Sequence, residues 1–186
     1  MRNSRKPVRV DLPGLRALLP IAVTVAVLLP ALAMGADAPR VSSEDRLESA
    51  VLDELNLVRL EHGLKQLRLN PKLTAAADHH SLEMVHSGYF GHESADGGNF
   101  AKRIKAFYRP RKARRGWTVG ENLIWQARRL TARAAVVSWL ASPGHRDNLL
   151  EPAFREVGIS AVRALGAPGV YGNQPVVVLT VDFGAR

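Results

Sequence analysis

The sequence predicts a single α+β domain, with helices in its first part and strands in its last. Apolar residues recur every three to four positions as far as Leu140, which is the helical period. Beyond Glu156 they alternate along the chain, which is typical of strands. Because the helices precede the strands instead of alternating with them, the pattern favours an α+β fold over parallel βαβ units. A chain of 186 residues, of which 46% are hydrophobic, can form one core.

Four helices are expected from capping residues and apolar spacing. Their expected limits are Ser42 or Ser43 to Gly63, Asn70 to Gly88, Phe100 to Phe107, and Thr131 to Ser142. Two strands follow, over 156–161 and 176–183, in which apolar side chains share one face. Glycine and proline punctuate the segment between them, so we expect the two strands to pair antiparallel.

The amino-terminal segment has the pattern of a secretory signal. Basic residues precede an uncharged stretch at 17–36, and Ala31-Leu32-Ala33 is a small-x-small cleavage site. We therefore expect a signal peptide at 1–33, a linker at 34–44 and the folded domain at 45–186. A secreted, periplasmic or cell-envelope protein follows, without an integral membrane domain once the signal is cleaved. An uncleaved anchor is the alternative, since about twenty uncharged residues can span a bilayer.

Cysteine is absent and basic residues are in excess, with a net charge of +9. The first fact excludes a disulfide framework, a thiolate zinc site, a cysteine nucleophile and a lipoprotein anchor. The second depends largely on one run, formed by Lys102, Arg103, Lys105, Arg109, Arg111, Lys112, Arg114 and Arg115. A solvated face is the simplest interpretation of this run. Anionic lipid head groups or envelope polymers are the partners to consider, and we expect no nucleic acid.

Four polar residues form the candidate site. His92, Glu121 and His145 each directly follow a glycine, and Glu156 begins the first expected strand. Glycine allows tight turns, so we expect these side chains on loops at the ends of elements. Two imidazoles and two carboxylates that meet in one cleft can bind a divalent metal or form imidazolium–carboxylate pairs. Separate, solvated side chains are the alternative that spacing alone leaves open.

Several motifs occur together in a fixed order. They are Asn56-x-x-Arg59, Gly63-Leu64, Leu67, His80-x-x-x-Met84, Tyr89-Phe90-Gly91-His92, Gly120-Glu121-Asn122, Trp139, Ser142-Pro143-Gly144-His145-Arg146-x-Asn148-Leu149, Phe154-x-Glu156-Val157-Gly158 and Phe183-Gly184. From about Leu47 to Gly184 the chain resembles the bacterial branch of the CAP superfamily, the cysteine-rich secretory, antigen 5 and pathogenesis-related proteins, whose unit is the SCP domain.

This resemblance implies a three-layer α-β-α sandwich with a small central antiparallel sheet. It also implies a cleft lined by a tetrad of two histidines and two glutamates, which match His92, Glu121, His145 and Glu156. All four are candidate ligands of a divalent metal such as zinc, with the two histidines first. Relatives of this superfamily are associated with sterol, fatty-acid and metal binding, so a lipid-like ligand is implied as well.

Other polar residues have simpler interpretations. His80 falls on the apolar stripe of its helix, so we expect a core histidine that makes hydrogen bonds. Glu83-x-x-His86 is half of a di-iron carboxylate motif, which needs a second copy that the chain lacks. Asn122 is expected to fix the segment that carries Glu121 through hydrogen bonds.

Three functions fit these observations. A non-catalytic binding module, whose cleft accepts a metal or a lipid-like ligand, is favoured. A metal-assisted hydrolase is the alternative, with His92 and His145 holding Zn²⁺ and a glutamate as general base. The chain carries no His-Glu-x-x-His motif and no nucleophile elbow to support it. Serine proteolysis ranks third, because no serine is paired with a base in a recognised motif. The sequence alone does not decide whether the protein is an enzyme.

Overall fold

The computed structural model of the protein describes residues 38–109 and 116–186. The expected signal peptide at 1–33 lies outside these residues. In chain order the elements are β1 (Arg40–Ser43), α1 (Asp45–Glu61), β2 (Arg68–Leu69), α2 (Pro71–Ser87), α3 (Phe100–Phe107), β3 (Thr118–Ala127), α4 (Ala132–Leu140), α5 (Pro143–Leu150), β4 (Glu156–Leu165), the 3₁₀ turn η1 (Gly169–Tyr171) and β5 (Val176–Ala185).

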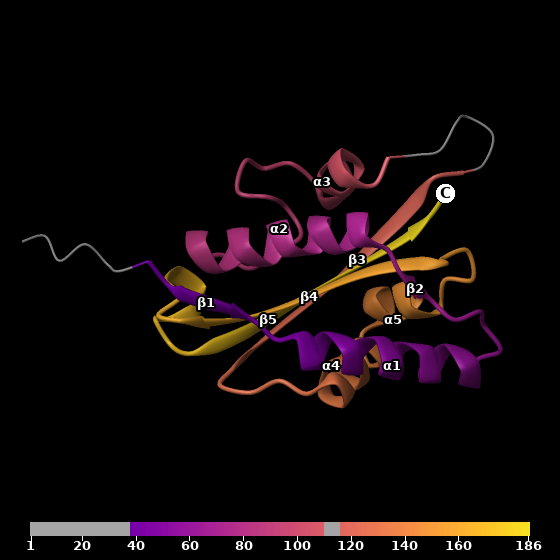
Figure 1. Cartoon of the computed structure of the whole chain (residues 1–186), viewed down its shortest axis with the longest axis horizontal. Helices are drawn as coiled ribbons and strands as arrows, with labels where there is room; N and C mark the ends of the chain where they lie inside the picture. Colours follow the sequence, from indigo (N-terminus) through magenta and orange to yellow (C-terminus); the bar gives the residue numbers. More distant parts are fainter. Residues whose placement is uncertain (1–37, 110–115) are drawn as a thin grey trace, which may run out of the picture. The chain divides into compact units, whose positions relative to one another are not determined.

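These elements form three layers. The sheet lies in the middle, with α2 and α3 on one face and α1, α4 and α5 on the other (Figure 1). Its strand order is β1-β4-β5-β3 with antiparallel neighbours, and β2 adds a two-residue parallel pairing to β4. The α+β class and the predicted α-β-α sandwich are therefore confirmed.

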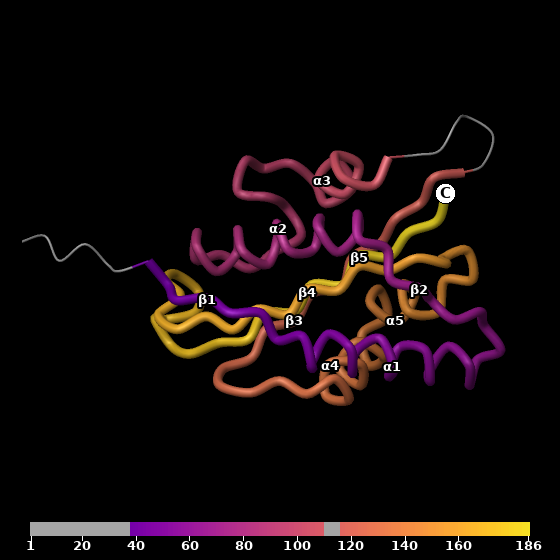
Figure 2. The backbone as a smooth tube through the Cα atoms, viewed as in Figure 1, coloured from indigo at the N-terminus to yellow at the C-terminus, as the bar shows by residue number. Residues whose placement is uncertain are grey.

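Strand β5 is central and is buried on both faces. Side chains such as Leu179 and Phe183 face the layer of α1, α4 and α5 and join the larger core cluster. Val176 and Val178 point the other way, into the cluster that includes Met84 of α2. The tube in Figure 2 shows β4 and β5 running together between the helical layers. The antiparallel pair predicted from the alternation is thus the middle of the sheet.

Glycine at position 158 lets α2 approach the sheet closely. A Cβ atom at Gly158 would lie 2.0 Å from the carbonyl carbon of Leu73, so no other residue fits there without moving α2. The predicted limits of α2 are confirmed, because the Asn70 side chain caps it by accepting from Lys72 N and the chain leaves the helix at Gly88.

Three departures from the sequence analysis matter for the site. Residues 40–43, expected in the linker, form β1 and pair with β4, and α1 therefore begins after Glu44 instead of Ser42 or Ser43. Ser142, expected to end a helix, stands at the start of α5, with Pro143 in its first turn. Finally, Glu121 lies inside strand β3 and not on a loop. Ten cross-strand pairs with β5 outweigh the turn preference of the Gly-Glu-Asn segment.

Candidate functional site

Three of the four predicted residues line one hollow of about 470 Å³. It is bounded by β3, the first turn of α5 and the segment that leads into α3. Its lining consists of His92, Glu93, Asn99, Phe100, Glu121, Ser142, Gly144, His145 and Asn148. Glu156 is not among the described residues that line it. The structure therefore joins His92, Glu121 and His145, which are far apart in the sequence.

Glu121 is the buried anchor of this site. Its side chain is fully shielded from solvent, and its carboxylate accepts the Nδ1–H of His92 at 2.8 Å. The other carboxylate oxygen accepts from the guanidinium of Arg103, whose side chain is also almost completely buried. Arg103 donates further to the His92 carbonyl at 3.1 Å and to Ser94 Oγ at 2.8 Å. One guanidinium thus neutralises Glu121 and holds the loop that carries His92.

Helix α5 is attached to β3 through asparagine side chains. Asn148 Nδ2 donates to the Glu121 carbonyl at 3.1 Å and to Asn122 Oδ1 at 2.9 Å. Asn122 in turn donates to the carbonyl of His145 at 3.0 Å, which confirms its expected structural role. Gly120 makes room for this contact, because a Cβ there would lie 2.5 Å from Asn148 Oδ1. These bonds place His145 across the hollow from His92.

The two imidazoles have opposite electrostatic environments although their ring centroids lie only 6.3 Å apart. The hydrogen bond to Glu121 raises the pKa of His92 above its usual value, despite partial burial. Burial, reinforced by the nearby His92, lowers the pKa of His145. His92 therefore holds its proton to higher pH than His145 does. Because Glu121 occupies Nδ1 of His92, Nε2 is the nitrogen left for a ligand.

A second carboxyl lies beside Glu121, on the neighbouring strand. Asp182 of β5 stands opposite Glu121 in the register, is fully buried, and receives no hydrogen bond from a described donor at either oxygen. Burial and the adjacent charge of Glu121 raise the pKa of Asp182 well above its usual range. A protonated Asp182 is neutral, so Arg103 balances one carboxylate and not two.

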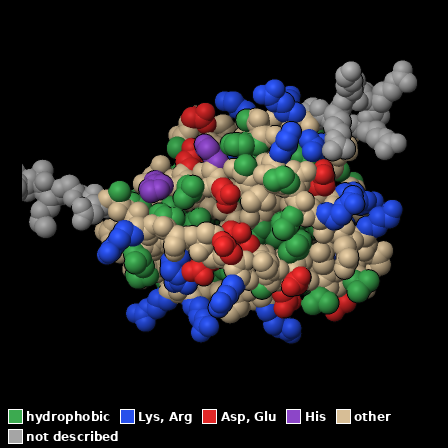
Figure 3. All heavy atoms as spheres, viewed as in Figure 1, with side chains coloured by type: hydrophobic (Ala, Val, Ile, Leu, Met, Phe, Trp, Pro, Cys, Tyr) green, Lys and Arg blue, Asp and Glu red, His purple; other side chains and the backbone are tan. Residues whose placement is uncertain are grey.

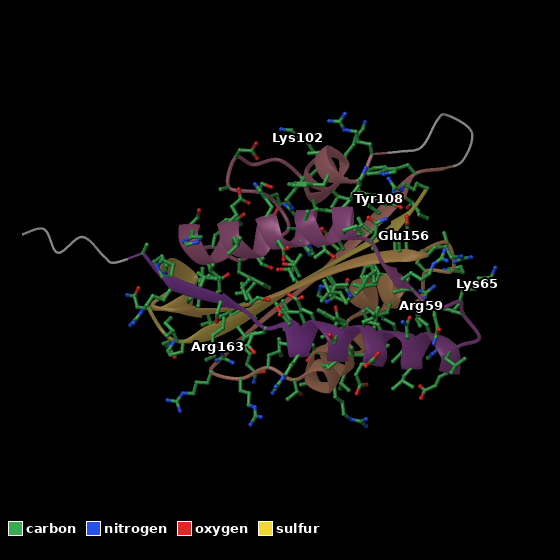
Figure 4. All side chains as sticks on the ribbon, in the orientation of Figure 1. Arg59, Lys65, Lys102, Tyr108, Glu156 and Arg163 are labelled. Carbon is green, nitrogen blue, oxygen red and sulfur yellow. The ribbon has the colours of Figure 1, made fainter. Side chains whose placement is uncertain are left out.

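Glu156 belongs to a different cluster. Its carboxylate accepts from Asn70 Nδ2 at 2.8 Å and from the Tyr108 hydroxyl, and Arg186 Nε lies 3.5 Å away. Figure 4 shows Tyr108 and Glu156 next to each other at the end of the sheet where β4 begins. These contacts connect the cap of α2, the end of α3 and the carboxyl terminus. The structure does not bring Glu156 to the hollow where the tetrad was expected.

His80 is a core histidine, as predicted. Its ring is fully buried, and Nε2–H donates to the carbonyl of Gly91 at 2.8 Å. Burial lowers the pKa of this imidazole, so the neutral form is favoured. The bond to Gly91 holds the chain one residue before His92, so His80 supports the site without lining it.

Arg103 and Asn148 are site residues that the sequence analysis missed. Arg103 was assigned to a solvated basic run, yet it is buried, whereas its neighbours Lys102 and Lys105 are exposed. A signal existed, because Arg103 lies three residues after Phe100 and four before Phe107, on the apolar face of α3. In Figure 3 most of the visible basic side chains lie around the outline of the molecule and do not form one patch. The run's members 111–115 lie outside the described residues.

The fold and this arrangement define a protein class, and sequence comparison agrees with it. The family model CAP, the cysteine-rich secretory protein family, matches residues 52–181, so the chain belongs to this family. Two proteins of Bacillus subtilis strain 168 are similar to it: the uncharacterized protein YkwD, 32% identical over 123 residues, and the uncharacterized membrane protein YlbC, 30% identical over 116 residues. The matches cover 66% and 62% of this chain but only 45% and 32% of those proteins, so the chain spans less than half of either relative.

Solved structures of other proteins have a similar fold to this chain. An extracellular protein containing an SCP domain from Bacillus anthracis str. Ames is 27% identical, with a TM-score of 0.59 over 76% of this chain and 41% of that one. An outer surface protein from Borrelia burgdorferi has the same TM-score at 18% identity, over 80% of this chain and 98% of that one. The latter supports the fold alone. Among the described helices, none combines the length and the apolar character needed to span a bilayer.

Proposed function

We propose that the protein is a non-catalytic binding module of the cell envelope or exterior, and that the hollow between His92 and His145 is its ligand site. The hydrogen bond from His92 Nδ1 to buried Glu121 carries this proposal, because it fixes the ring and leaves Nε2 for a ligand. The extracellular SCP protein of Bacillus anthracis and the expected signal peptide support the location.

The ligand we propose is a divalent metal ion held by two imidazoles. A histidine that binds metal commonly donates its other ring N–H to a carboxylate, and His92 has this partner in Glu121. The described residues contain no group of three or more histidine or acidic side chains able to hold a metal. The site that we propose is therefore an open one, with His92 and His145 as its two protein ligands, and not a closed structural zinc site with four protein ligands. A bound cation would supply positive charge at the hollow and attract an anionic ligand.

The contacts of the carboxylates favour binding over hydrolysis. A metal-assisted hydrolase needs a glutamate free to take a proton from water. Both oxygens of Glu121 are engaged, by His92 and by Arg103, and Glu156 lies in another cluster. No serine hydroxyl of the described residues hydrogen bonds to a histidine ring, so serine proteolysis has no support. A lipid-like ligand or an anionic envelope partner stays a prediction from the sequence.

Calorimetric titration with Zn²⁺ tests the proposed metal site. We expect one site near neutral pH, lost in His92→Gln and His145→Gln, and weakened about tenfold or more in Glu121→Gln, since a carboxylate behind a metal ligand tunes its affinity. Affinity should fall in acid, because protons compete for the imidazoles, first at His92 with its raised pKa. His86→Gln, on the exposed surface of α2, is the matched control and should bind like the wild type.

Two results would contradict this proposal. Undetectable Zn²⁺ uptake at neutral pH removes the metal site. Turnover of a peptide, ester or phosphodiester panel by the zinc-loaded protein, abolished in Glu121→Gln, would favour the hydrolase instead.

A further inference from the structure

A second hollow of about 420 Å³ lies between α2 and α3, next to the site described above, and Asn99 lines both. Its wall includes His79 and Glu83 from α2, Asp96 from the loop, and Lys102 and Phe107 from α3. Arg103 also borders this hollow, although its guanidinium is paired with the buried carboxylate of the first site. None of the functions considered so far uses the second hollow.

Glu83 is a partly buried carboxylate in this wall. Its side chain is 20% exposed, and it accepts the Tyr89 hydroxyl at 2.5 Å. Burial alone would raise the pKa of Glu83, but hydrogen bonds from the Tyr89 hydroxyl and from the Ala95 backbone contribute to lowering it overall. The carboxylate is therefore charged at neutral pH.

No described cation neutralises this charge. His80 Nδ1 lies 3.4 Å from the carboxylate, but burial favours the neutral ring, whose proton is on Nε2 and bonded to Gly91. Lys102 lies 3.7 Å from Asp96, and Arg103 is paired with Glu121. Each basic side chain of the wall thus has its own acidic partner, and Glu83 is left with neutral donors only.

Aromatic rings stand on the same wall. The His79 and Phe107 rings pack with centroids 5.7 Å apart at an interplanar angle of 54°. A ring face attracts a cation, and a nearby carboxylate adds a charged partner. From this hollow, its unbalanced carboxylate and its aromatic wall, we infer a second binding site, for a small organic cation that carries an ammonium or guanidinium group on an apolar stem, with Glu83 as counter-ion.

Three probes of the same shape test the charge requirement in the full chain. Phenethylamine, 2-phenylethanol and 3-phenylpropionate share an aromatic body and carry a positive, neutral and negative head group. In NMR titrations we expect the amine to shift resonances of α2 and α3 around the hollow with saturation, and the alcohol and acid to bind about tenfold weaker or not at all. Equal binding of amine and alcohol would overturn the proposal, and this comparison needs no variant.

Matched variants then assign the counter-ion. Glu83→Gln should weaken phenethylamine binding about tenfold, whereas Glu61→Gln, on the exposed end of α1, should leave it unchanged. Lys102→Gln should tighten binding, because it removes a competing cation at an exposed position and frees Asp96. An unchanged affinity in Glu83→Gln, or tighter binding of the acid than the amine, would contradict the assignment. Zn²⁺ titration of the same samples reports on the site at His92 and His145 alone. A failure of the amine site can therefore be told apart from a failure of the metal site.

Discussion

Two buried arginines in this domain differ in the partners to which they donate hydrogen bonds. Arg59 of α1 is completely buried and donates only to backbone carbonyls, those of Lys65, Leu149, Glu151 and Phe154. Figure 4 shows it pointing from α1 towards the segment with Lys65. Arg103 is nearly as buried, but its main partner is the carboxylate of Glu121, at the edge of a hollow. One guanidinium joins backbone segments, and the other balances a site charge.

This contrast shows how the contacts of a residue reveal its role where burial does not. The partners of Arg59 cannot be removed by mutation, because they are main-chain carbonyls, in the segment after α1, at the end of α5 and in the turn after α5. The partner of Arg103 is a side chain that also orients His92. We therefore expect Arg59 to contribute mainly to the stability of the fold. Arg103 and Glu121 form a charge pair whose two members can be replaced together, and its main role is to hold the site at the hollow.

The largest expected effect comes from Arg59→Met. Leu149, Glu151 and Phe154 would lose the donor to their carbonyls, and each buried polar group left unpaired costs about 1–3 kcal/mol. We expect a loss of at least about 3 kcal/mol in the free energy of unfolding, measured by urea denaturation. Arg59→Lys keeps the charge but has fewer hydrogen-bond donors, so its free energy of unfolding should lie between those of the wild type and Arg59→Met. A loss below about 1 kcal/mol in Arg59→Met would show that the comparison is wrong.

Arg103→Met should be nearly as damaging, but reversible by a second change. It leaves the buried carboxylate of Glu121 unbalanced, and breaking a buried pair costs about 3–5 kcal/mol. Adding Glu121→Gln removes that charge, so the double variant should recover most of the lost stability. A double-mutant cycle in urea measures this coupling. Additive losses would mean that Arg103, like Arg59, acts through the backbone carbonyl and loop contacts alone.

Much of the fold followed from local signals in the sequence. The limits of α2 depend on the cap at Asn70 and the glycine at 88, and the β4–β5 pair depends on alternation that both faces of the sheet preserve. Strand β3 was missed because its Gly-Glu-Asn segment resembles a turn, and only pairing with β5 makes it a strand. Helix α5 was missed because Ser-Pro-Gly is typical of a helix end, although serine and proline also begin helices.

The site was predictable only in part, because spacing along the chain does not give strand register. His92, Glu121 and His145 come together as expected. In the register of the sheet, Gly158 of β4 and Glu121 of β3 both stand opposite Asp182 of β5. Glu156 lies two positions before Gly158 and stands opposite Gly184. That offset takes Glu156 along the sheet to Tyr108. The buried partners Arg103 and Asp182 were not foreseen, since charged residues are usually exposed.

The central claim is that Glu121, neutralised by Arg103, orients His92 towards a hollow shared with His145. NMR titration of the imidazole resonances tests it most directly. We expect His92 to titrate above 6.5 and His145 below it, and we expect Glu121→Gln to lower the pKa of His92. Because the folded-state pKa of His92 is raised, the stabilising contact with Glu121 is complete below about pH 6.5 and is lost as pH rises through the folded value. Two histidines that titrate together near 6.5, unchanged in Glu121→Gln, would show that Glu121 does not orient His92.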